Sequence, residues 1–378
     1  MIPRKFKTPQ WLMPLTSQKG YMLVAALTLM TVLTLLGTTA YILSSTDIKV
    51  GGNFRNSQQA LQVAMAGGER ARELLRLENS TSSNYASFSD ELGKLLRSGI
   101  NHVLDGNITP TDDQSIASGT MNGISYAAYL TNDSSDGTAN TTDNNGKVMI
   151  TTVATGTDNS KAIVQTVVRL FPGPSSPATV YTKGDVTGNG TSLTISGDDA
   201  CDEGPNLDAI YAKGDWNPNG TPTITGAVTE FGTTDLDIAG MISQLKASAN
   251  ITLTEDTNGA TYGSSSDYKV VYSNTSSPTN VNGLKLNNLT GYGILLVDGD
   301  LELAGGFNWN GIILVTGAVK LNGGGADPVN ISGQLLSGTS TVTDISINGA
   351  NNITYNSCNV KQATTTAPLT VVNWKQSY

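Results

Sequence analysis

One stretch of this sequence is longer and more apolar than an ordinary globular helix requires. It runs for 24 uncharged and largely apolar residues, Tyr21–Ser44. A helix of that length spans roughly 36 Å, which is enough to cross a hydrocarbon core of about 30 Å. The first acid, Asp47, follows the run, and four cations precede it: Arg4, Lys5, Lys7 and Lys19. Because positive charge stays cytoplasmic, we expect the C-terminal portion, about 330 residues, to lie across the membrane from it.

A small-to-aromatic junction, Gly20–Tyr21, separates the basic leader from the apolar run. A secretory signal carries its apolar run before the cleavage site, whereas a cut at this junction leaves the run on the mature chain. We therefore predict a leader over residues 1–20 and a retained membrane-spanning helix over 21–44. Removal of the leader's four cations changes the formal charge from −9 to −13, a balance that argues against a nucleic-acid surface.

Residues 45–172 predict an α+β unit. We expect one proline-free helix to continue from Tyr21 to about Leu77, with a short second helix from Ser89 or Asp90 to about Ser98. Strands are predicted over 123–130, 147–155 and 162–171, the last two as a hairpin. The lower half of the long helix should lie across this sheet, because small and apolar residues recur there mostly at spacings of three and four: Phe54, Ala60, Leu61, Ala64, Gly67, Gly68, Ala71, Leu74 and Leu75.

A proline-rich linker at 173–177 precedes a β-rich head domain over 178–378 with internal repeats. Residues 293–306 (GILLVDGDLELAGG) align without gaps to 311–324 (GIILVTGAVKLNGG), and a looser copy begins at Gly333. Residues 181–197 resemble 211–226. Short strands that recur every 18 to 30 residues indicate stacked coils of a parallel β-solenoid, with a β-sandwich as the alternative. Residues 235–249 predict a helix over an open end of the solenoid.

Two cysteines, Cys201 and Cys358, lie on the expected extracytoplasmic side, where thiols tend to be oxidised. We predict a disulfide between them. In the chain-entropy model, closing so long a loop is worth roughly 5 kcal/mol.

Catalytic chemistry is not indicated by the sequence, so we expect no enzyme. His102 is the one histidine and has no Cys or second His near it in sequence. Solenoids do host carbohydrate-active enzymes, and Asp298, Asp300 and Lys320 are candidates for such a site on successive coils. A β-helix enzyme would, however, usually have a denser cluster of acids and bases. The aromatic residues of the repeats, Trp216, Phe307 and Trp309, are expected to be buried.

Calcium is the cofactor the sequence leaves open. Three acidic turns offer hard oxygen ligands, and none has the EF-hand spacing. Ordinary solvated loops are the alternative interpretation. The turns lie at 132–137, 143–146 and 198–203.

The N-terminal residues carry a family resemblance. SQKGYMLVAALTLMTVLTLLG, followed by GGNFRNSQQALQVAMAGGERARELL, resembles the N-terminal region of PilX-type minor pilins of the type IV pilus system. The resemblance implies that a prepilin peptidase cuts after Gly20 and methylates Tyr21. Most major pilins have a glutamate at the fifth mature position, where this chain has Ala25. Its absence implies a position at the tip, or a priming role, rather than the shaft.

Three functional hypotheses follow. The first is a minor pilin of a type IV pilus, inserted in the inner membrane and later displayed on the pilus, with other pilins, the prepilin peptidase and the inner-membrane assembly platform as partners. A pseudopilin of a type II secretion system is its close alternative. The second adds adhesion by the head to a surface ligand or tip adhesin. The third is a β-helix carbohydrate-active enzyme anchored by a pilin helix.

Overall fold

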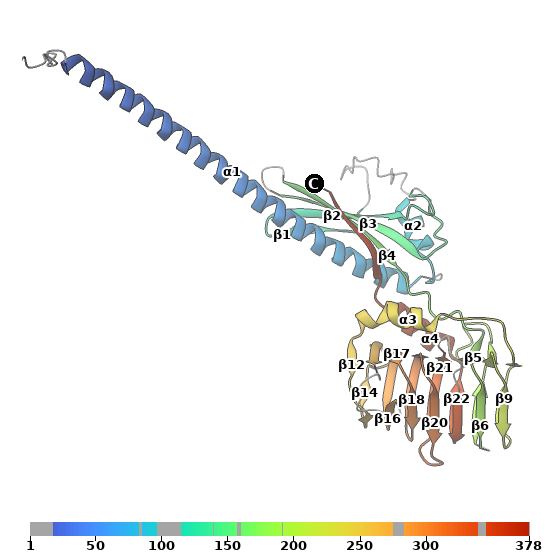
Figure 1. Ribbon diagram of the computed structural model, residues 1–378. Helices are drawn as coiled ribbons and strands as arrows, with labels where there is room; N and C mark the ends of the chain where they lie inside the picture. The colour runs from blue at the N-terminus through green and yellow to red at the C-terminus, as the bar shows by residue number, and fades with distance from the viewer. Residues whose placement is uncertain are drawn as a thin grey trace, which may run out of the picture.

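The computed structural model describes most of the chain, and all structural statements below concern these residues: 18–82, 85–96, 115–138, 140–156, 160–190, 192–274, 283–338 and 345–377. His102 lies outside them. Figure 1 shows a long helix that projects from a small α+β unit, with a separate β-rich body below it. The predicted class, a long N-terminal helix with an α+β unit and a mainly-β head, is confirmed.

Helix α1 (Gln18–Ser80) is unbroken over 63 residues. It continues without a break through Gly37, Gly51 and Gly52. Its contact with the sheet begins later than predicted: Phe54 is 66% exposed, whereas Ala60, Ala64, Ala71 and Leu75 are fully buried. Gly67 lies against the ring of Tyr126, where an added Cβ would clash. Small residues thus let the helix approach the sheet closely.

The first sheet has five strands in the order β1-β2-β3-β4-β24, all antiparallel. The strands are β1 (Ala117–Met121), β2 (Ile124–Asn132), β3 (Lys147–Thr155), β4 (Lys161–Arg169) and β24 (Thr370–Ser377). A short helix, α2 (Ser89–Leu96), packs beside it. The hairpin β3-β4 is confirmed. Strand β24 corrects the predicted head boundary, because the last residues of the chain return to this sheet and the head is inserted between two of its strands.

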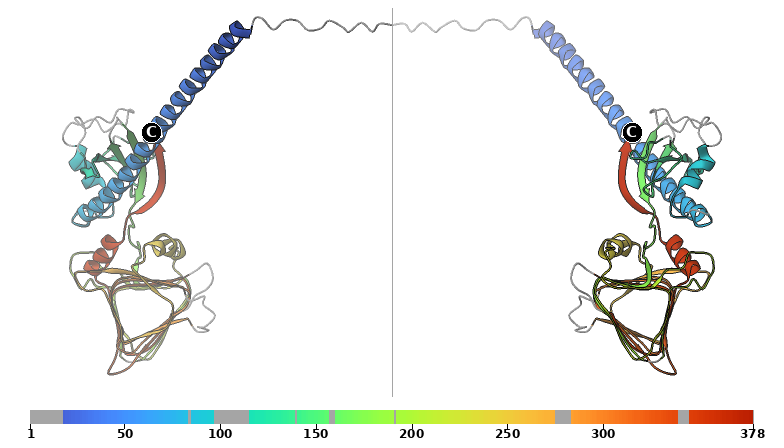
Figure 2. Two further views of the ribbon diagram at one scale, coloured as in Figure 1. Left: turned by 90° about the vertical axis from the view of Figure 1, so that its left-hand side faces the viewer. Right: turned by 90° about the vertical axis from the view of Figure 1, so that its right-hand side faces the viewer.

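The head is a parallel β-solenoid, not a sandwich, and Figure 2 shows its triangular cross-section. One side is a seven-stranded parallel sheet in the order β13-β16-β18-β20-β22-β6-β9. A twelve-stranded sheet forms the other two sides. Every pairing between named strands in the head is parallel.

The strands of the seven-stranded sheet are β13 (Thr257–Asn258), β16 (Leu284–Asn287), β18 (Leu301–Ala304), β20 (Val319–Gly323), β22 (Ile345–Gly349), β6 (Val186–Asn189) and β9 (Trp216–Asn219). The other sides contain β5 (Ala178–Thr182), β7 (Leu193–Ser196), β8 (Asp208–Ala212), β10 (Thr223–Thr225), β11 (Val228–Thr229), β12 (Ile251–Leu253), β14 (Thr261–Tyr262), β15 (Lys269–Asn274), β17 (Thr290–Asp298), β19 (Asn308–Val315), β21 (Val329–Ser337) and β23 (Asn351–Thr354).

The offsets between the sequence repeats equal the offsets between paired residues of neighbouring strands. Gly293 pairs with Gly311, and Leu301 with Val319, as the 18-residue repeat predicts. Tyr181 likewise pairs with Tyr211. At Gly311 the backbone adopts φ +132° at a vertex of the triangle, and an added Cβ would clash with the carbonyl oxygen of Gly293. Only glycine fits such a stacked corner, since L side chains disfavour this φ.

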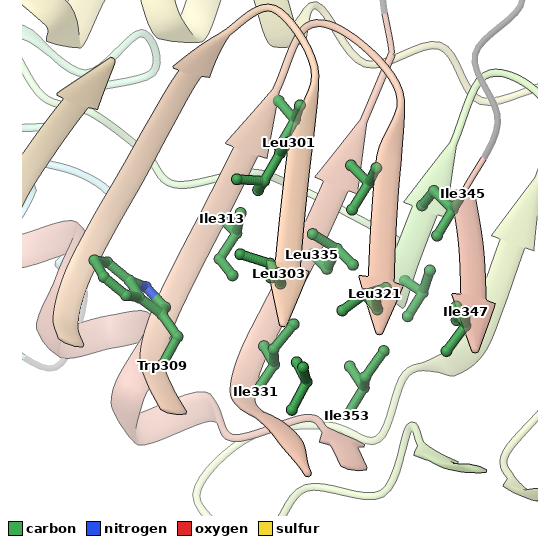
Figure 3. Close-up of a cluster of buried hydrophobic side chains, with 14 of the residues drawn as sticks. Leu301, Leu303, Trp309, Ile313, Leu321, Ile331, Leu335, Ile345, Ile347 and Ile353 are labelled. Atoms are coloured by element: carbon green, nitrogen blue, oxygen red, sulfur yellow. The ribbon is translucent and has the colours of Figure 1, made fainter. Parts of the chain in front are cut away.

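Alternate residues of each strand fill the interior with aliphatic layers, and Figure 3 shows how successive coils superpose them. Phe307 and Trp309 are buried in this core, as predicted, with their rings stacked at 6.1 Å. Trp216 is only half-buried, because it lies in a terminal coil. Burial of such continuous apolar layers is the main favourable contribution to folding of the head.

The coils are not stacked in chain order. The first coil, β5-β6-β7, pairs on one side with the next coil, β8-β9-β10, and on the other with the last coil of the chain, β21-β22-β23. The intervening coils begin at the far end with β12, β13 and β14 and wind back toward the first. The solenoid is thus permuted. The pairing between its first coil and the last coil of the chain, which we call the seam, joins segments about 155 to 160 residues apart.

Two helices cover the outer face of one side. They are α3 (Ile238–Leu245), which a 3₁₀ turn (Lys246–Ser248) extends, and α4 (Ser357–Thr366). Both pack on β17 and β19, so the strand run GILLV is buried on both faces, which explains its continuous apolar character. Helix α3 therefore carries the chain across this side and does not cover an open end as predicted.

Candidate functional site

The most prominent surface of the molecule is the upper half of α1. Apart from Ser45, which is half-buried, every residue from Tyr21 to Arg55 is exposed, and the large apolar side chains from Tyr21 to Ile42 are at least half accessible. The helix is long and apolar enough to span a membrane. A monomer in water would rarely leave so large an apolar surface uncovered.

Threonines interrupt the apolar surface without leaving free hydroxyls. The hydroxyl of Thr34 donates to the carbonyl of Met30 at 2.7 Å, and that of Thr39 to Leu35 at 2.8 Å. Thr28, Thr31, Thr38 and Thr46 make bonds of the same kind. Because each hydroxyl is satisfied within its own helix, this surface can enter lipid or an apolar bundle at little cost.

The three N-terminal positions singled out by the sequence all lie on this helix. Gly20 and Tyr21 fall in its first turns, and Ala25 lies in the exposed apolar half. Cleavage at Gly20–Tyr21 and methylation of Tyr21 stay predictions.

The lower end of α1 also fixes the head. Arg76 donates to the carbonyl of Thr365 at 3.1 Å and is held by Glu73, whose carboxylate lies 2.6 Å away. Arg72 donates to the carbonyl of Leu369 at 3.3 Å. These contacts join α1 to the last turn of α4 and to the segment that leads into β24, so the helix is bonded directly to the end of the head.

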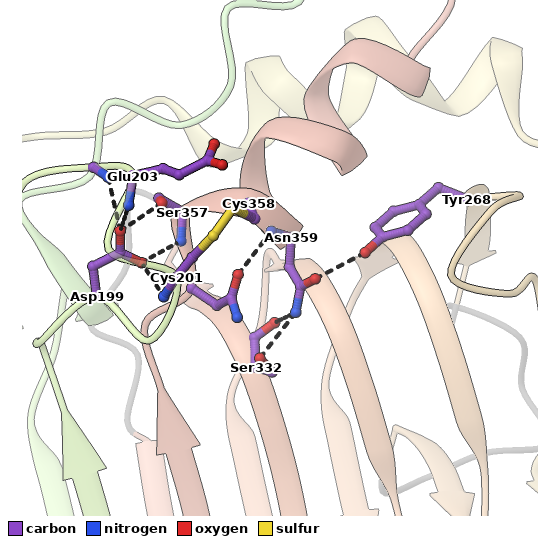
Figure 4. The surroundings of a disulfide bond; sticks show 10 residues. Asp199, Cys201, Glu203, Tyr268, Ser332, Ser357, Cys358 and Asn359 are labelled. Carbon is purple, nitrogen blue, oxygen red and sulfur yellow. Dashed lines mark hydrogen bonds between the residues drawn. A yellow bond between two sulfur atoms is a disulfide. The ribbon is translucent and has the colours of Figure 1, made fainter.

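Cys201 and Cys358 form a disulfide, with a Cα–Cα distance of 5.9 Å (Figure 4). It links the loop after β7 in the first coil to α4, which follows the last coil. Among the described residues, the one group with clustered potential metal ligands is Cys201, Glu203 and Cys358, and the disulfide uses both of its sulfurs.

Asp199 reinforces the same junction. Its carboxylate accepts the Ser357 hydroxyl at 2.6 Å, the Ser357 amide at 2.7 Å and the Gly204 amide at 2.8 Å, as Figure 4 shows. Burial alone would raise the pKa of this 5% exposed carboxyl. The bonds from Ser357 and from loop amides outweigh that effect and lower the pKa to about 2. The third acidic turn, 198–203, thus links the first coil to α4 through hydrogen bonds.

Acids of the other two turns also accept hydrogen bonds from backbone amides. Asp143 accepts the Phe88 amide at 2.8 Å and the Gly146 amide at 2.8 Å. Asp133 accepts from the Ser135 hydroxyl and from the Asn145 amide group, which lowers its pKa although burial acts in the opposite direction. Both acids therefore stabilise the loops that contain them.

Asp298 ends β17, Asp300 lies in the turn before β18, and Lys320 lies on β20. Asp300 accepts the Ala318 amide at 2.7 Å, and Asp185 accepts the Asp215 amide at 2.9 Å in the equivalent turn of another coil. Asp298 accepts from the Thr316 hydroxyl at 3.2 Å. Lys320 pairs in register with Glu302, which forms a 2.9 Å ion pair with Lys285. These residues support successive turns of the solenoid.

No family model and no curated protein matches this chain. Among solved structures that match is the crystal structure of the competence-associated pilin ComZ from Thermus thermophilus, at 12% identity and a TM-score of 0.23, over 85% of this chain and 98% of that chain. At so low a TM-score, this similarity carries no argument about fold or function.

Proposed function

We propose that this chain is a minor pilin, similar to the PilX type, that enters or primes a type IV pilus and displays its solenoid head outside the cell. The observation that carries the proposal is α1: its exposed apolar half continues without a break into a half that packs on an antiparallel sheet. The upper half holds the precursor in the inner membrane, and then packs among the helices of other pilins. Because lipid tails and neighbouring helices are similarly apolar, the transfer from lipid to the filament exposes little apolar surface to water.

The leader is removed by a prepilin peptidase, and the assembly platform then extracts the mature subunit. Replacing Gly20 with leucine should leave an uncleaved precursor, whereas Met22→Leu, which conserves the apolar character two residues later, should be processed normally. Mass spectrometry of the N-terminus measures both. Normal processing of Gly20→Leu would contradict the assignment.

Ala25 supports a place at the tip rather than in the shaft. A lone carboxylate in an apolar helix is costly unless it is paired. In a filament, the free N-terminus of a neighbouring subunit would pair with it, and a chain without the carboxylate lacks that attraction. Introducing Ala25→Glu should move a labelled head from the pilus tip to positions along the shaft, as seen by electron microscopy. An unchanged distribution would remove the support for this placement.

We further propose that the head is not enzymatic. The candidate catalytic acids accept hydrogen bonds within the solenoid, Asp300 from the Ala318 amide and Asp298 from the Thr316 hydroxyl. A pseudopilin role in type II secretion uses the same helix, and deletion of the gene separates the two, since it removes pili in one case and secretion in the other.

A further inference from the structure

The vertex of the solenoid farthest from α3 and α4 carries two rows of uncharged polar side chains. We call this vertex the distal ridge (Figure 2). It lies where the seven-stranded sheet ends and the next side of each coil begins. The turns of the ridge often contain Asn-Gly, as at Asn189, Asn258 and Asn348.

The first row lies at the end of the seven-stranded sheet. Strand register places one outward residue from each coil in line, and six of the seven are asparagine. The seventh is Ala304. The asparagines, in spatial order, are Asn258, Asn287, Asn322, Asn348, Asn189 and Asn219.

The second row lies just past the turn and again takes one residue from each coil. It has three central asparagines, Asn308, Asn330 and Asn352. Threonines continue it at both ends: Thr261 and Thr290 on one side, Thr194 and Thr223 on the other. Neither row contains a charged side chain, and all of its members are exposed or half-buried.

The amides form ladders along the coils. Asn330 donates to Asn308 at 2.7 Å, and Asn352 to Asn330 at 2.9 Å. In the first row Asn189 donates to Asn348 at 2.9 Å. Each side-chain amide has two N–H donors and two acceptor lone pairs, so these bonds fix its orientation and use only part of its hydrogen-bonding capacity. Six inter-strand intervals of roughly 4.8 Å make this array about 29 Å long.

The chemistry of the ridge selects its partner. A nucleic acid or acidic polymer requires cations, but the rows have none and the whole chain has a formal charge of −9. Asp327, one of the acids counted in that charge, lies in a turn of the ridge. A peptide that adds as a strand requires a free backbone edge, and the backbone between the terminal coils is already paired. A neutral polymer with repeating hydroxyl groups matches a neutral, preorganised array of amides and hydroxyls.

We propose that the distal ridge binds a neutral polysaccharide that lies across the coils. This inference rests on the proposed display of the head outside the cell and names the class of ligand for that head. The buried Phe307 and Trp309 take no part in it, so recognition relies on hydrogen bonds and not on stacking of sugars on aromatic rings.

The test uses the full chain in a detergent without sugar groups, with dextran and laminarin as neutral probes and alginate as an acidic one. Wild type should bind a neutral probe and not alginate. The variant Asn330→Ala/Asn352→Ala should bind that probe roughly tenfold more weakly, as expected when two hydrogen-bonding amides are lost. Thr187→Ala/Asn217→Ala, a pair on the seven-stranded sheet two residues before Asn189 and Asn219 of the first row, is the matched control and should bind like wild type.

Thermal unfolding of each variant separates lost binding from lost structure, and Thr194→Trp supplies a second variant that blocks the ridge without removing an amide ladder. Equal binding by wild type and both ridge variants, preference for alginate, or no binding to either neutral probe would overturn the proposal. The ridge variants should enter pili like wild type whether or not the head binds a polysaccharide, so failure of this proposal is distinct from failure of the proposed assembly role.

Discussion

Removal of the disulfide tests how the permuted solenoid is held closed. The perturbation is the double substitution Cys201→Ser/Cys358→Ser, which leaves no free thiol. The cysteines are 157 residues apart. The loop that they close contains every strand from β8 to β23. Without the cross-link, the unfolded chain regains loop-closure entropy worth roughly 5 kcal/mol in the chain-entropy model.

The loss should be localised. Strands β5, β6 and β7 pair with β21, β22 and β23, which lie about 155 to 160 residues later in the chain. We therefore expect amide hydrogen exchange to accelerate most in β5–β10, while the central strands β17 and β19 stay protected. Chemical denaturation gives the change in the free energy of unfolding, and hydrogen exchange with mass spectrometry gives its location.

The wild-type protein under reducing conditions is the control and should reproduce the behaviour of the double variant. A loss of free energy below about 1 kcal/mol would refute the reasoning, because the cross-link would then restrict little of the unfolded ensemble. Uniform acceleration of exchange across all coils would refute the localisation to the seam.

Three further predictions concern single residues. Asp199→Asn should lower the unfolding free energy at pH 7 by up to about 2 kcal/mol. Because the folded carboxyl has its pKa lowered from 3.8 to about 2, its stabilisation is complete above pH 4 and is lost as the pH falls toward 2, so denaturation curves of the two proteins should converge there. Gly311→Ala should cost more than about 1 kcal/mol through its positive φ, whereas Gly325→Ala, which has open space around it, should cost less; equal melting temperatures would contradict this. Leu75→Ala should cost about 2–5 kcal/mol by leaving a cavity between α1 and the sheet, and unaltered thermal unfolding would show that the site collapses.

Much of the architecture is readable in the sequence because it depends on local pattern. The uncharged run and its small-residue continuation specify α1, since helical periodicity acts within a few residues. The 18-residue repeat specifies which residues stack, because equivalent positions of adjacent coils must share a register. The hairpin β3-β4 follows from two alternating runs and a short turn.

Other features were decided only by tertiary structure. The permuted order of the coils, the return of β24 to the first sheet and the position of α3 over a side of the solenoid all join segments far apart in the chain. No periodic signal encodes such contacts, since they depend on which exposed faces and strand edges remain to be covered once the local units form. The two rows of the distal ridge illustrate the division: the sequence contains each Asn and Thr at its repeat position, but rows assembled from the first, last and middle coils exist only after the seam closes.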